Sequence, residues 1–271
     1  MLEILSHEFM QNAFLAALLA SIACGVIGAL VVVNRLVFMA GGIAHAAYGG
    51  IGLAFYFGWP VIPSTIGFTL FSSVVMGKVT LHRKERSDTV VGVLWAAGMA
   101  LGILLLDLSP GYNVDLMSYL FGSILTVPGS DVLIMLVLDV CLICLVLLFY
   151  KYFLAISFDQ EFARARGIPV SVLYFTLLAM IAISVVMIIQ VVGLILVIAL
   201  LTIPSYMAQR QSASLGKMML LATSWSLFFC VTGLWLAYVF NLTSGASIIA
   251  FGTICFTIQL FYDWSKKRLR G

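Results

Sequence analysis

The chain has 271 residues, of which 63% are hydrophobic and only 9% are charged, and its mean hydropathy is +1.17. A soluble globular domain carries roughly a quarter charged residues, so this composition excludes a soluble fold. The net charge of +3 is too small and too dispersed to form a nucleic-acid-binding surface. Unbroken apolar stretches of about 20 residues recur along the chain, which predicts an all-α, polytopic transmembrane helical bundle.

Polar breaks divide the chain into candidate spans. We expect these spans near residues 9–33, 38–57, 61–79, 89–107, 132–150, 171–190, 191–208, 217–240 and 245–262. The run 170–204 is about 50 Å long as a helix, well over one bilayer crossing, so it must turn or contain a broken piece. Residues 1–271 are therefore expected to form a single transmembrane domain of eight spans plus a half-helix, or of nine spans.

The basic residues fall in five patches, and two predicted spans separate each consecutive pair. These patches are Arg35, residues 78–86, residues 151–166, Arg210 with Lys217, and residues 266–270. All 14 Lys and Arg then lie on one side, which the positive-inside rule assigns to the cytoplasm. We therefore expect the N-terminus outside and the C-terminus inside. The outer side has only acidic charges, at Glu3, Glu8, Asp107, Asp115 and Asp131.

Residues 157–169 form the most informative polar stretch, because they contain the signals that begin and end a short helix. Ser157 or Asp159 can cap its start, and Glu161 suits the positive end of the helix dipole. Gly167 can adopt the left-handed conformation that ends many helices.

The same stretch has further features of a short docking helix. Arg164 and Arg166 suit the negative end of the dipole, and Pro169 blocks continuation. Phe158 and Phe162 lie four residues apart and give one apolar face, which can pack on the membrane domain, on lipid or on a cytoplasmic partner. A surface connector with no partner is the alternative.

The chain has no phosphate-binding loop of the Walker type. Residues 77–78 and 216–217 are both Gly-Lys, but they lack the upstream glycine and the following Ser or Thr that such a loop requires. If transport uses ATP, another chain must bind it.

Five sequence motifs together resemble the membrane permease of zinc/manganese-type ATP-binding-cassette importers, the ABC-3 family. They are residues 42–46, 86–94, 115–125 with Asp131, 161–170 and 190–204. The resemblance runs from about residue 25 to about residue 252. It implies an ABC-importer permease fold and a location in a prokaryotic inner membrane.

This resemblance also implies function and partners. Residues 157–169 would be the coupling helix that docks on a separate ATPase, with contacts from Asp159, Glu161, Phe162, Arg164, Arg166 and Gly167. The chain would form a homodimer that receives its metal from an extracytoplasmic binding protein. The cargo would be a divalent transition metal, with zinc favoured over manganese or iron, and the chain itself would bind no cofactor.

His45 is the residue that we expect to matter most for the cargo. Gly41, His45, Gly49 and Gly52 share one face of the second span. Small residues permit close helix packing, and an ionisable group within a span usually points into the bundle or a wet cavity. Neutral imidazole can bind Zn, Mn or Fe, whereas the alternative is a histidine that packs by hydrogen bonding to a backbone carbonyl.

The sequence departs from the family pattern beside this histidine. The family usually has an Asp four residues before it, where this chain has Gly41. Without that carboxylate, His45 can make only a weak contact unless another helix supplies oxygen. Asp139, in the middle of the fifth span, is a candidate for that oxygen, but it could equally accept hydrogen bonds from a neighbouring helix.

Two other classes of function are less consistent with the sequence. A self-powered secondary metal transporter should have several acids within its spans for ion coupling, and only Asp139 is clearly placed there. An intramembrane enzyme would need a nucleophile and base or a cluster of metal ligands, but His7 and His82 lie outside the spans and leave His45 alone.

Overall fold

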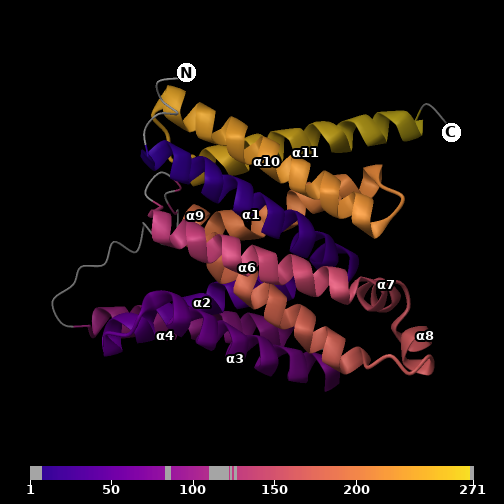
Figure 1. Ribbon diagram of the computed structural model, residues 1–271, viewed down its shortest axis with the longest axis horizontal. Coiled ribbons are helices and arrows are strands. Elements are labelled where there is room, and N and C mark those ends of the chain that lie inside the picture. Colours follow the sequence, from indigo (N-terminus) through magenta and orange to yellow (C-terminus); the bar gives the residue numbers. More distant parts are fainter. Residues whose placement is uncertain (1–7, 83–86, 110–121, 123, 125–126, 269–271) are drawn as a thin grey trace.

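The computed structural model describes residues 8–82, 87–109, 122, 124 and 127–268 (Figure 1). In these ranges the chain is helical almost throughout and contains no strand. The helices are α1 (Glu8–Val33), α2 (Val37–Phe57), α3 (Val61–His82), α4 (Ser87–Asp107), α6 (Gly129–Leu148), α7 (Tyr150–Phe158), α8 (Gln160–Ala165), α9 (Val170–Gln211), α10 (Leu215–Phe240) and α11 (Ser244–Arg268).

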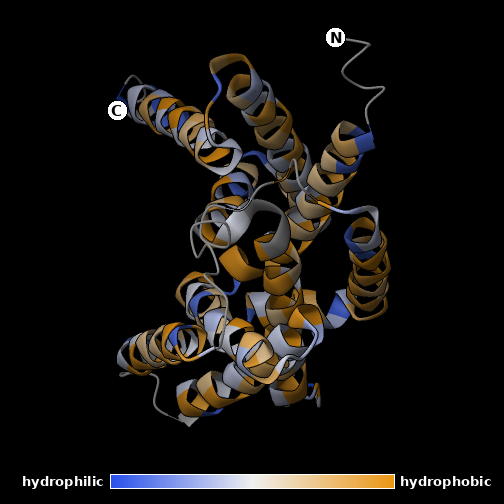
Figure 2. Ribbon diagram, turned by 90° about the vertical axis from the view of Figure 1, so that its left-hand side faces the viewer, coloured by the Kyte–Doolittle hydropathy of each residue, from blue (hydrophilic) through white to orange (hydrophobic). Residues whose placement is uncertain are grey.

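Eight of the described helices are long and apolar enough to cross a membrane, which confirms the predicted all-α, polytopic bundle. Hydrophobic residues predominate along the helices in Figure 2, and many large hydrophobic side chains are exposed on the surface of the bundle. A bundle surrounded by lipid needs this distribution, because its outer surface does not face water.

Helix α9 contains the chain reversal that the sequence left open. Tyr174 lies 3.5 Å from the sulfur of Met39, and Ile198 lies beside Gly41, two residues further along α2. In a straight helix, 24 residues would separate Tyr174 from Ile198 by about 36 Å, so α9 must fold back.

The fold-back occurs at Gly193, whose φ of 77° and ψ of 169° are not helical. Sequence reasoning placed the division at Gln190, three residues earlier. The positive φ explains the difference, because glycine adopts it without steric cost. The two halves, residues 170–192 and 194–211, therefore begin and end at the same end of the bundle.

Three contacts between distant segments define one end of the bundle. Asn34 donates a 2.9 Å hydrogen bond to Ser157, and the backbone N–H of Gly216 donates one of 2.9 Å to the hydroxyl of Tyr150. Arg210 forms a 2.6 Å ion pair with Asp263. These contacts bring together the end of α1, helix α7, the end of α9, the start of α10 and the end of α11.

This end carries basic side chains, and we call it the basic end. Its described members are Arg35, Lys78, Lys151, Arg164, Arg166, Arg210, Lys217, Lys266 and Arg268. Glu8, Asp107 and Asp131 lie at the opposite, acidic end. In Figure 1, α1 accordingly begins at the left, and α11 ends at the right, which is also the side where α7 and α8 lie. Of the residues used for the orientation, residues 83–86, Glu3, Asp115 and Arg270 lie outside the described ranges.

Close packing of α2 follows from its glycines. Helix α2 packs most extensively against α4, and further against α3 and α9. A Cβ added at Gly52 would lie 2.5 Å from the carbonyl oxygen of Gly102, and one added at Gly49 would lie 2.5 Å from the ring of Phe68. Of the glycines on the predicted face of the second span, Gly49 and Gly52 therefore permit close approach of α3 and α4, whereas Gly41 makes only ordinary contact with Ile198.

Most hydroxyl groups within the spans are satisfied by their own helix. The side chains of Ser21, Thr65, Thr69, Thr202 and Thr223 each donate a hydrogen bond to a backbone carbonyl three or four residues earlier. This arrangement hides polar groups from lipid without a partner helix. Buried polar atoms that lack such a bond are therefore exceptions that need an explanation.

Candidate functional site

The exceptions are few among the described side chains. The buried side-chain atoms without a hydrogen-bond partner belong to His45, Tyr48, Asp139, Ser184, Ser205, Ser226 and Gln259. Leaving such a group unsatisfied costs about 1–3 kcal/mol, and more for a charged group. Two of these residues, His45 and Asp139, are also the two metal candidates from the sequence.

His45 lies in the middle of α2 and is partly buried. Its ring stacks on Trp95 of α4, with ring centroids 4.0 Å apart and an angle of 14° between the planes. Its Nδ1 atom is buried and has no partner, so the hydrogen bond to a backbone carbonyl that the packing alternative requires is not formed there. The stack fixes the ring orientation, and Nδ1 remains without a hydrogen-bond partner.

Gly41 lies one helical turn before His45, at the position where the family usually has Asp. A Cβ added there would lie 3.5 Å from Cδ1 and 4.0 Å from Cγ1 of Ile198, which is ordinary van der Waals contact. In contrast, a Cβ at Gly42 would lie 2.5 Å from Val91. The structure therefore accommodates a Cβ at position 41 without displacement of a neighbour, but not at position 42.

Asp139 is almost fully buried in α6, at 2% exposure, and both of its carboxylate oxygens lack a partner. The predicted alternative, in which a neighbouring helix donates hydrogen bonds to it, is therefore not observed. Asp139 lies within electrostatic range of Cys24 of α1, whereas His45 lies against α4. The described residues show no hydrogen bond between Asp139 and His45, so a shared role for the two in metal contact stays a prediction.

The described residues contain no group of three or more His, Cys, Asp or Glu side chains placed to hold a metal ion. Within the described part of the chain, His45 is therefore not a member of such a group. A lone imidazole suits brief contact with an ion in transit, because a permeation site must also release its ion.

The predicted coupling segment, residues 157–169, contains the last two residues of α7 and all of α8, and Asp159 lies between the two helices. The carboxylate of Asp159 accepts hydrogen bonds from the backbone N–H groups of Glu161 (2.9 Å) and Phe162 (3.0 Å). Asp159 is therefore the cap, while the other candidate, Ser157, instead accepts a hydrogen bond from Asn34. The capping residues in the sequence thus correctly indicated the start of α8.

The end of α8 also follows the prediction. Gly167 has a φ of 77°, and the N–H of Ile168 donates a 3.1 Å hydrogen bond to the carbonyl of Ala163. Backbone bonds of this kind end a helix at a left-handed residue. Pro169 then precedes the first residue of α9.

The outer surface of this segment is unpartnered within the chain. Phe158 is 84% exposed and Phe162 is 58% exposed, and the guanidinium of Arg166 lies 5.5 Å from the centre of the Phe162 ring. Glu161 and Arg164 are exposed as well. The predicted apolar face exists, but it points away from the chain's own core.

Sequence reasoning did not identify Trp95 or Ile198 as neighbours of His45 and Gly41. One signal was present, because the fourth span has small residues at Gly98 and Gly102 that allow α4 to approach α2. The contact with Ile198 had no local signal, since it depends on the reversal of α9.

Comparison with known proteins identifies the chain. The model of the ABC 3 transport family matches residues 6–263. An uncharacterised membrane protein of Synechocystis is 51% identical, with 97% of this chain and 93% of that protein covered. The manganese transport system membrane protein MntC of Listeria monocytogenes is 32% identical, with 98% and 96% covered.

A solved structure agrees with these matches. One chain of PsaBC from Streptococcus pneumoniae, in complex with Fab, superposes with a TM-score of 0.87 at 30% identity, covering 95% of this chain and 93% of that one. The chain belongs to the ABC 3 transport family and has the fold of an ABC-importer permease.

Proposed function

We propose that this chain forms the translocation path of an ATP-driven importer whose cargo is manganese. The observation that carries this proposal is His45, whose Nδ1 is buried and unpartnered in α2. Neutral imidazole can bind first-row divalent metals, and no thiolate cluster that would select a softer ion exists among the described residues.

The relatives support manganese rather than the zinc expected from the sequence. MntC of Listeria monocytogenes and ScaB of Streptococcus gordonii, 32% and 30% identical to this chain, are both named for manganese. Zinc has no support from these names. A single nitrogen ligand, with the remaining ligands supplied by water, is compatible with a weakly held manganese ion.

Two changes in α2 test the role of His45. Replacing His45 with Ala should slow ATP-driven uptake of radioactive manganese about tenfold, on the scale of a lost contact to a charged group of about 1.5–3 kcal/mol. Replacing Gly41 with Asp should add a carboxylate one turn away, where Ile198 leaves room. That variant should retain manganese after purification, as measured by elemental analysis.

The control for the second change is Gly41→Asn, which has nearly the same shape but no charge and should not retain the metal. If His45→Ala transports normally while His45→Leu fails to assemble, His45 is only a packing element. In that case Asp139 becomes the leading candidate for contact with the ion.

The proposed orientation places the basic end in the cytoplasm, because the positive-inside rule applies to the short loops found there. The N-terminus is then outside and the C-terminus inside. Single cysteines placed at Ser130, at the acidic end, and at Ala213, between α9 and α10, should react with an impermeant maleimide from opposite sides of the membrane. Labelling of both from one side would contradict this orientation.

The proposed partners are a cytoplasmic ATPase, a second copy of this chain and an extracytoplasmic metal-binding protein. The exposed Phe158 and Phe162 at the basic end support the ATPase contact, since the chain has no phosphate-binding loop of its own. The outward-facing Gly92, which has no atom within 4 Å of an added Cβ, supports close approach of a second copy along α4. Light scattering in detergent should give the mass of two chains, and a single-chain mass would contradict the homodimer.

A further inference from the structure

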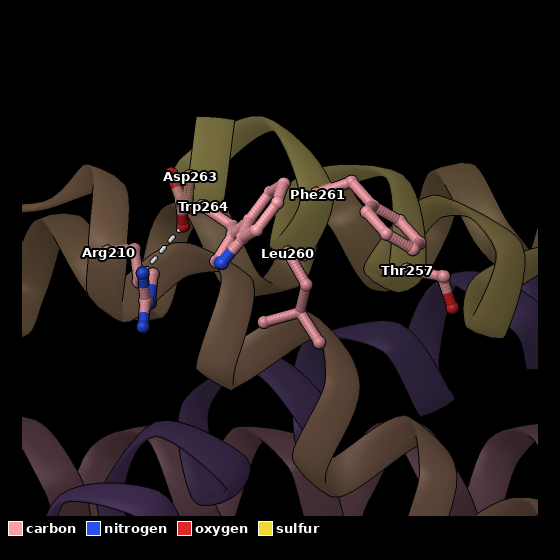
Figure 3. Close-up of a pocket in the computed structure, with 6 residues that line it drawn as sticks. All are labelled: Arg210, Thr257, Leu260, Phe261, Asp263 and Trp264. Atoms are coloured by element: carbon pink, nitrogen blue, oxygen red, sulfur yellow. Dashed lines mark hydrogen bonds and ion pairs between the residues drawn. The ribbon is translucent and has the colours of Figure 1, made fainter. Parts of the chain in front are cut away.

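A pocket of about 610 Å³ lies at the basic end, between the end of α9 and the last turns of α11 (Figure 3). Its lining combines a basic, an acidic and several apolar side chains. They are Arg210, Thr257, Leu260, Phe261, Asp263 and Trp264. None of the roles proposed for His45, Asp139 or the coupling segment uses these residues.

Arg210 is the polar centre of the pocket. Its guanidinium donates hydrogen bonds to Asp263 at 2.6 Å and to the hydroxyl of Tyr206 at 3.2 Å. The hydrogen bond to Tyr206, and after it the one to Asp263, raises the pKa of Arg210, so the guanidinium stays cationic. A guanidinium has five N–H donors, and the two contacts leave others for an anion that enters the pocket.

One more cation lies next to the pocket on α11. The guanidinium of Arg268 lies 4.7 Å from the ring centre of Trp264, which lines the pocket. Together with Arg210 it gives two positive charges against the single negative charge of Asp263. The surroundings therefore favour an anion.

The other wall of the pocket is apolar and outward-facing. Leu260, Phe261 and Trp264 are 38%, 67% and 58% exposed. They lie within the last two turns of the candidate span, which ends at Lys266, so they are at the level where a membrane changes from hydrocarbon to headgroups. Figure 3 shows the Trp264 ring between Arg210 and Phe261.

We propose that this pocket binds an anionic phospholipid, with the phosphodiester near Arg210 and Arg268 and an acyl chain along Leu260 and Phe261. Basic pockets between helices at a membrane surface bind such headgroups, and the combination of charge and adjoining apolar wall matches both parts of the molecule. The site requires only that the chain spans a membrane, so it is independent of the cargo and of ATP.

Native mass spectrometry of the purified full chain, mixed with phosphatidylglycerol or with phosphatidylcholine of the same acyl chains, tests the proposal. Phosphatidylglycerol should be retained about fivefold more strongly, and glycerol phosphate without acyl chains should not displace it. Equal retention of the two lipids would overturn the proposal, and so would displacement by glycerol phosphate.

The matched variants separate the pocket from general charge. The double variant Arg210→Gln with Asp263→Asn keeps the net charge and a hydrogen-bonded pair, yet it should abolish the preference for phosphatidylglycerol. Lys151→Gln removes a basic residue outside the pocket and should leave the preference intact. If the double variant keeps the preference, or if a cysteine at Phe261 crosslinks efficiently to a second copy in phosphatidylglycerol bilayers, the pocket is not a lipid site.

Discussion

Replacing Gly167 with Val is expected to reduce ATP-driven uptake about tenfold and to weaken association with the ATPase. Gly167 has a φ of 77°, and nothing lies within 4 Å of an added Cβ. A side chain there therefore meets no obstacle, and only the backbone is strained. The left-handed conformation costs an ordinary residue roughly 1–2 kcal/mol, and more for a β-branched one, which is about a tenfold change in population.

The consequence is local because α8 is only six residues long and depends on its two ends. A strained end would move Phe162 and Arg164 away from the surface they present to the partner. Gly167→Asn is the matched control, because Asn tolerates the left-handed region, and it should keep most of the activity. Co-purification with the ATPase measures both variants. Normal association and uptake in Gly167→Val would mean that residues 157–169 are a connector only.

Replacing Gly52 with Ala is expected to lower the thermal stability of the protein markedly. The new Cβ would lie 2.5 Å from the carbonyl oxygen of Gly102, which is backbone and cannot rotate away. Separation of α2 and α4 would follow. Overpacking of this kind costs typically 1–3 kcal/mol, and here it would also disturb the stack of His45 on Trp95.

The control is the same change at Gly67 of α3, where nothing lies within 4 Å of an added Cβ. Gly67→Ala should leave the stability unchanged or raise it slightly, since Ala is the better helix former. Thermal unfolding followed by intrinsic fluorescence in detergent compares the two variants. Equal melting temperatures for Gly52→Ala and the unmodified protein would contradict the packing described for α2 and α4.

The fold could be predicted closely, because a helix that crosses lipid needs a long apolar segment with charged residues only at its ends. Apolar length and the position of charges locate the spans, and the structure confirms the helices predicted from them. The exact point of reversal in α9 could not be read, because Gln190 and Gly193 are both plausible breaks in a sequence that is apolar on either side. Only the backbone of Gly193 distinguishes them.

The candidate site could be predicted in part. The capping residues Asp159 and Gly167 are local signals, so the bounds of the coupling segment followed from the sequence. The surroundings of His45 depend on Trp95, fifty residues away, and no pattern within one span reveals such a contact. The pairing of Asp139 with His45 was a chemical argument with no sequence signal for the position of either helix. In the structure, α6, which carries Asp139, packs mainly on α1, and α2, which carries His45, packs mainly on α4.

The central claim is that this chain is a permease powered by a separate ATPase. The most direct measurement is uptake of radioactive manganese into vesicles that contain the chain with its ATPase, compared with vesicles that contain the chain alone under an imposed proton gradient. The account predicts uptake that requires both ATP and the ATPase, with none above background from the gradient. Uptake by the chain alone, driven by the gradient, would contradict it and would establish a secondary transporter.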